Sequence, residues 1–136
     1  MEELTPQEAI IHLMVMVSAS DRDMGDVELS RIGAIVRTLP AFAAFDDART
    51  LDVARACQRW LQRENGFAEI LDAAVKAIPA VAHDTAYAIA VDIAVADRQV
   101  EPEELRMLHI LRERLELDPA AISAIERAAR ARHRTL

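Results

Sequence analysis

The chain contains little glycine and few aromatic residues. Its 136 residues include three glycines, and aromatic residues make up 4%, whereas hydrophobic residues make up 52%. The three glycines, at positions 25, 33 and 66, form neither a glycine-rich phosphate loop nor a dinucleotide fingerprint. Scarce aromatic side chains and abundant alanine favour helices over strands. The hydrophobic content is too high for a disordered chain, and the length suggests one domain covering residues 1–136.

Three further absences indicate the cellular compartment of the protein. Cys57 is the only cysteine, so an internal disulfide is excluded and a reducing compartment fits. No apolar run approaches the roughly 20 residues of a membrane helix, and the longest, residues 86–96, is interrupted by Asp92. The N-terminus, Met-Glu-Glu, lacks the basic start of a signal peptide. We therefore expect a cytoplasmic protein that does not span a membrane.

Positive charge is also in deficit. The formal net charge is −7, which argues against nonspecific nucleic-acid binding and is compatible with cations or basic protein partners. Paired histidine spacing and a nucleophile–base–acid set are both missing, so the sequence predicts no enzyme. We expect Cys57 to be a small buried thiol rather than a nucleophile. Asp92 either points to solvent or is a partly buried acid that pairs with an arginine or joins the acidic corner.

Helical spacing of apolar residues, together with capping signals, predicts an all-α bundle of seven helices. Thr5, Pro6 and Glu8 form the start of a capping box, and Asp118 is a second helix cap. The predicted helices cover about residues 5–20, 26–38, 47–64, 67–78, 84–96, 102–115 and 119–132.

Two stretches, residues 21–29 and 97–105, repeat one pattern at an offset of 76 (97 − 21 = 76). Five pairs of identical or similar residues match: Asp21 with Asp97, Arg22 with Arg98, Met24 with Val100, Glu28 with Glu104 and Leu29 with Leu105. An internal duplication of this kind predicts a bundle with approximate two-fold symmetry and two equivalent helix-loop-helix corners.

Each corner places a carboxylate at the start of a helix. A helix ends at the aspartate, Met24 or Val100 plugs the turn, and Glu28 or Glu104 falls in the first turn of the next helix. A carboxylate there faces unpaired N–H groups and the positive end of the helix dipole, so both glutamates are explained as caps. The alternative is a cation site, because the Asp-to-Glu spacing matches the second half of an EF-hand loop.

An independent EF-hand is excluded by its missing first half and by the arginine in place of the loop glycine. Carboxylates from the two corners still meet if the two repeats pack together. The sequence leaves both explanations of the corners open.

The corner pattern resembles the TerB-like, tellurite-resistance-associated domain. The second copy, residues 95–105 (Val-Ala-Asp-Arg-Gln-Val-Glu-Pro-Glu-Glu-Leu), matches well, and the first has Ser20 where that copy has alanine. The resemblance implies an all-helical domain of two related halves and divalent-cation binding through acidic residues. It also implies a link to tellurite or metal stress. Finally, it implies protein partners in membrane-associated complexes. The implied metal ligands are Asp21, Glu28, Asp97 and Glu104. Oxygen ligands alone suit calcium or magnesium.

Arg22 and Arg98 depart from the family, which usually has glycine after the aspartate. A guanidinium beside a carboxylate can form an ion pair that competes with a metal. If both arginines pair with Glu28 or Glu104, the site is locked without metal. If they point outward, a cation site remains.

A different class of function is a purely helical protein-interaction module without a metal site. In that case the acidic residues only shape the loops. The apolar segment at residues 41–45, with Phe42 and Phe45, would dock a partner helix, unless both rings pack in the core.

Overall fold

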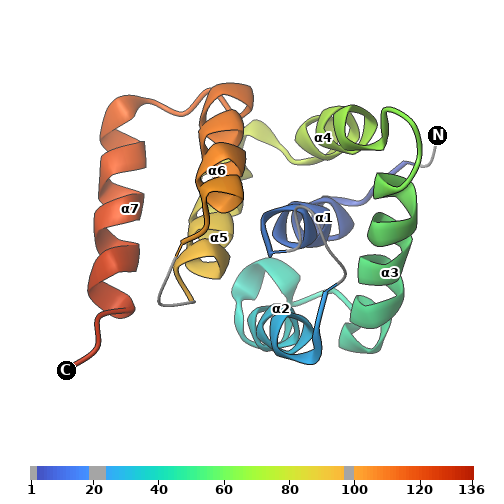
Figure 1. The fold of residues 1–136 in the computed structure, drawn as a ribbon, viewed down its shortest axis with the longest axis horizontal. Helices are drawn as coiled ribbons and strands as arrows, with labels where there is room; N and C mark the ends of the chain where they lie inside the picture. Colours follow the sequence, from blue (N-terminus) through green and yellow to red (C-terminus); the bar gives the residue numbers. More distant parts are fainter. Residues whose placement is uncertain (1–2, 19–23, 97–99) are drawn as a thin grey trace.

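The fold is built around α1 (Pro6–Ser18), whose central residues are buried on all sides. In a computed structural model that describes residues 3–18, 24–96 and 100–136, every residue from Ala9 to Val17 is buried. A helix that is apolar all round belongs in a core rather than on a surface. Helices α2 to α6 all contact α1, which lies between α3 and α5 (Figure 1).

Among the described residues, six further α-helices surround or extend this core: α2 (Asp26–Thr38), α3 (Thr50–Leu61), α4 (Gly66–Ala77), α5 (His83–Val95), α6 (Pro102–Arg114) and α7 (Pro119–Arg132). Three short 3-10 turns join them: η1 (Pro40–Phe42), η2 (Asp47–Arg49) and η3 (Ala80–Ala82). The described part of the chain contains no strand, which confirms the all-α prediction. The third helix differs most from expectation, because its first turn is 3-10 and it ends at Leu61 rather than near residue 64.

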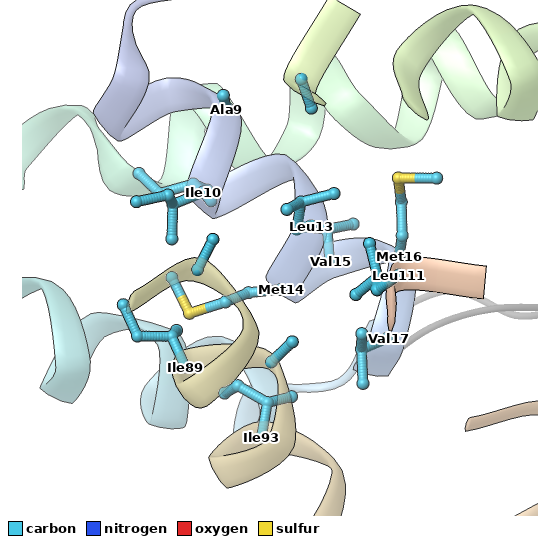
Figure 2. Packing of buried hydrophobic residues seen from close by; sticks show 14 of the residues in the cluster. Ala9, Ile10, Leu13, Met14, Val15, Met16, Val17, Ile89, Ile93 and Leu111 are labelled. Atoms are coloured by element: carbon cyan, nitrogen blue, oxygen red, sulfur yellow. The ribbon is translucent and has the colours of Figure 1, made fainter. Parts of the chain in front are cut away.

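The structure repeats as the sequence does. Helices α2 and α6 begin 76 residues apart (102 − 26) and end 76 residues apart (114 − 38). Helices α1 and α5, which precede them, are offset by 77 residues at both ends (83 − 6 and 95 − 18). The two repeats, α1 with α2 and α5 with α6, meet through α1 and α5, where Met14 lies beside Ile89 (Figure 2).

Polar contacts fasten the C-terminal helix α7 to α5 and α6. The Tyr87 hydroxyl donates to Glu126 Oε2 (2.5 Å) and accepts from Arg112 Nε (2.9 Å). Burial and the neighbouring Glu126 carboxylate raise the pKa of Tyr87 to about 12. Arg132 donates to Asp92 Oδ1 (2.6 Å), so Asp92 pairs with an arginine instead of pointing freely to solvent.

No single described helix is long and apolar enough to cross a membrane. One pair, Gly66–Ala77 with Ala80–Val95, meets that length and composition only when its members are combined across a 106° bend.

The turn between α3 and α4 depends on a close backbone approach. Asn65 has a φ of 63°, and the Cβ of any residue at position 66 would lie 2.1 Å from the Trp60 carbonyl oxygen. Glycine is required at this position because the oxygen belongs to the backbone and cannot rotate away.

We predict that Gly66→Ala lowers the free energy of unfolding by at least about 2 kcal/mol, since the helix ends must separate. Gly33→Ala is the matched control, because its Cβ would meet only the flexible Arg37 side chain at 3.0 Å. Alanine should be neutral there or stabilising by up to about 1 kcal/mol. Urea unfolding of both variants checks this, and equal effects would contradict it.

Candidate functional site: the paired acidic corner

Glu104 caps the start of α6. It is 8% exposed, and its Oε1 accepts a hydrogen bond from the Glu101 N–H at 2.9 Å. The carboxylate thus satisfies a backbone donor that the helix itself leaves unpaired. This confirms the capping interpretation for Glu104.

Glu28 has the equivalent place in the first turn of α2. Its side chain folds back towards Gly25, the residue before the helix. A Cβ at position 25 would lie 3.0 Å from Glu28 Oε2. Glycine at this corner therefore leaves space for the carboxylate.

The two glutamates, one from each repeat, line the same small cavity. Its volume is about 10 Å³, and Ser18, Arg31 and Ile93 complete its lining. A space of this size is close to the smallest that holds one water molecule. The packing of α1 on α5 brings the ends of these helices together, and α2 and α6 each start next to such an end. Two residues 76 positions apart in sequence thereby share one site.

The remaining predicted ligands, Asp21 and Asp97, lie outside the described residues, as do Arg22 and Arg98. The ion-pair lock by these arginines therefore stays a prediction. Met24, the predicted plug of the first corner, is buried, and Ser18 Oγ lies 3.5 Å from its sulfur. Its counterpart Val100 is half-buried.

Sequence reasoning missed Arg31 as a member of this site. It follows Glu28 by three residues on α2, a spacing that places two side chains on one helix face. That spacing is the feature of the sequence that could have placed Arg31 beside Glu28. A guanidinium beside two carboxylates offsets part of their charge and competes with a metal for them. Within residues 3–18, 24–96 and 100–136, no three His, Cys, Asp or Glu side chains group as metal ligands.

The other candidates from the sequence are structural. Cys57 is fully buried, and burial raises its pKa to about 12, so the thiolate needed of a nucleophile is suppressed. Phe42 is buried, and Phe45 packs against it with ring centroids 6.0 Å apart. The Arg49 guanidinium covers the Phe45 ring at 5.6 Å. Residues 41–45 therefore do not present a pair of exposed phenylalanines to a partner helix, because Phe42 packs in the core and half-buried Phe45 packs against Phe42 and Arg49.

Comparison with protein families decides the identity of the fold. The model of the family described as tellurite resistance protein TerB matches residues 7–131. The chain belongs to the TerB family. The matched span covers both repeats, and it includes Glu28 and Glu104. No curated protein and no solved structure was found to match the chain.

For this TerB-family chain we predict that Glu104→Ala lowers the free energy of unfolding by about 1 kcal/mol, because the Glu101 N–H loses its acceptor. Glu104→Gln keeps an amide oxygen at that place and should cost less than half as much. Chemical unfolding of both variants at neutral pH measures the difference. Equal losses would show that the charge of Glu104, rather than its role as acceptor, holds the corner.

Proposed function

We propose that this TerB-family chain is a non-enzymatic binding domain whose two acidic corners hold one divalent cation between the repeats. The observation that carries the proposal is the cavity shared by Glu28 and Glu104. Each carboxylate comes from the start of a helix in a different repeat. A cation there would tie the two halves together.

The chemistry of the donor set favours a hard cation. Glu28 and Glu104 offer carboxylate oxygens, and Asp21 and Asp97 are the further ligands that the family resemblance implies. Calcium and magnesium prefer oxygen ligands, and calcium takes six to eight of them. Two glutamates alone do not complete such a shell, so the proposal depends on the loop aspartates or on water to supply the rest.

Arg31 sets the affinity of the proposed site. The cation must displace the favourable interaction between its guanidinium and the nearby carboxylates. Removing that positive charge should strengthen cation binding. We therefore propose that Arg31, as well as the arginines of the two loops, limits metal occupancy.

The cellular role in this proposal comes from the family. A link to tellurite or metal stress, a cytoplasmic location and protein partners in membrane-associated complexes are carried over from TerB. The net charge of −7 suits a partner with a basic surface.

We predict that calcium, magnesium or manganese binds the wild-type chain in calorimetric titration. The double variant Glu28→Gln with Glu104→Gln should bind about tenfold or more weakly, since both carboxylates are lost. Arg31→Gln should bind more tightly than wild type. Glu113→Gln, on the exposed end of α6, is the control and should bind as wild type does.

Equal affinity of the double variant and wild type, or binding of none of the three cations, would refute the cation site. A protein-interaction module without metal is then the remaining function. Two exposed apolar side chains favour it, because Val27 (60% exposed) and Leu105 (53% exposed) each adjoin a corner glutamate. A partner for that surface would combine apolar and basic side chains.

A further inference from the structure

A second and larger hollow lies between the start of α1 and one face of α3. Its volume is about 450 Å³, within the range of small-ligand sites. Seven residues of η2, α3 and the turn after it line one wall: Arg49, Asp52, Val53, Ala56, Arg59, Trp60 and Arg63. The opposite wall comes from α1 and the segment before it: Glu3, Leu4, Glu8 and His12. We call this hollow the α1–α3 groove.

The apolar part of the groove is held firmly in place. Trp60 is buried, and its indole N–H donates to Glu69 Oε1 at 2.9 Å. The His12 ring packs edge-on against Trp60, with centroids 6.0 Å apart and an interplanar angle of 80°. Val53 and the small Ala56 precede Trp60 on the same face of α3. A ligand would therefore meet a preformed apolar surface.

Some charged side chains around this surface have a partner within the described part of the chain and others do not. Arg49 donates to Glu8 Oε2 at 2.8 Å, so these two offset each other. Burial raises the pKa of Glu8, but its hydrogen bonds with Thr5 and Arg49 together outweigh burial and lower the pKa overall, which keeps the pair charged. No hydrogen bond or ion pair from any described residue engages the guanidinium of Arg59 or Arg63.

Arg59 and Arg63 are four residues apart, a spacing at which like charges repel each other. A carboxylate between them would relieve that repulsion and accept paired hydrogen bonds, for which the arginine fork is suited. Asp52 lies seven residues before Arg59, which is about 10 Å along a helix. Three residues of extended peptide span about the same length.

We propose that the α1–α3 groove binds the C-terminal end of an extended peptide. The α-carboxylate pairs with Arg59 and Arg63, and an apolar side chain packs on Val53 and Ala56. A peptide N–H or amine faces Asp52. Capture of a C-terminal carboxylate is a known mode of peptide recognition, and the two guanidinium groups take the part that backbone N–H groups play elsewhere. The proposal is independent of the cation site, because none of these residues lines the corner cavity.

The probe is alanyl-leucyl-alanine, followed by nitrogen-15 NMR at the indole N–H of Trp60, the only tryptophan of the chain. We expect a saturable shift with a Kd below about 1 mM. The same tripeptide with a C-terminal amide should bind about tenfold or more weakly, because it lacks the carboxylate. An absent shift, or equal binding of acid and amide, overturns the proposal.

Variants assign the contacts. The double variant Arg59→Gln with Arg63→Gln should weaken binding of the tripeptide about tenfold or more. Ala56→Leu should also weaken it, because the larger side chain fills the space that the apolar side chain of the peptide would occupy. Arg55→Gln is the control, because Arg55 is on α3 outside the groove and contacts Gln58. It should bind as wild type does. Unchanged helical content by circular dichroism verifies each fold, and wild-type affinity in the double arginine variant refutes the proposal.

Acetylating the amine of the tripeptide distinguishes two sources of this ligand chemistry. Undiminished affinity identifies the C-terminus of a longer chain as the ligand. A loss of affinity that Asp52→Asn reproduces with the unmodified tripeptide identifies a free oligopeptide, whose amine meets Asp52. Both results retain the carboxylate at Arg59 and Arg63.

Discussion

Burial of α1 on all of its faces is the constraint on which the rest of the structure depends. The nine residues from Ala9 to Val17 are all buried, so five other helices must pack around a single one. This packing also places both candidate sites. Ser18, at the end of α1, lines the corner cavity, and Glu8 and His12, near its start, line the α1–α3 groove. One helix thus connects two chemically different surfaces, because Glu8 and Ser18 are about three turns apart on α1.

The duplication gives the acidic corner its particular character. Glu104 caps α6 by accepting the Glu101 N–H, and Glu28 lies at the equivalent place in the first turn of α2. Packing the two repeats against each other then brings one carboxylate from each repeat, Glu28 and Glu104, into one cavity. The cost of bringing like charges together is offset in part by Arg31. Arg31 lines the same cavity as both glutamates.

The C-terminal half is fastened by polar contacts to a greater extent than α1. Tyr87, Arg112 and Glu126 satisfy one another where α5, α6 and α7 meet, and Arg132 pairs with Asp92. A buried hydroxyl without such partners would be costly. These contacts hold α7 against α5, at the end of the molecule opposite α3 (Figure 1). The α1–α3 groove is consequently separated from α7 by the core.

The sequence by itself determined the helices, the duplication and the placement of Glu28 and Glu104, because these depend on local spacing, capping residues and a repeat offset. It also carried the resemblance to TerB, which rests on a short continuous motif. Only the tertiary structure decided that Arg31 joins the two glutamates, that Asp92 meets Arg132, that Phe42 is buried and that Arg59 and Arg63 border a groove. Each of these facts depends on how helices distant in the chain pack together. Helical periodicity specifies which face of a helix is apolar, but not which other helix covers it.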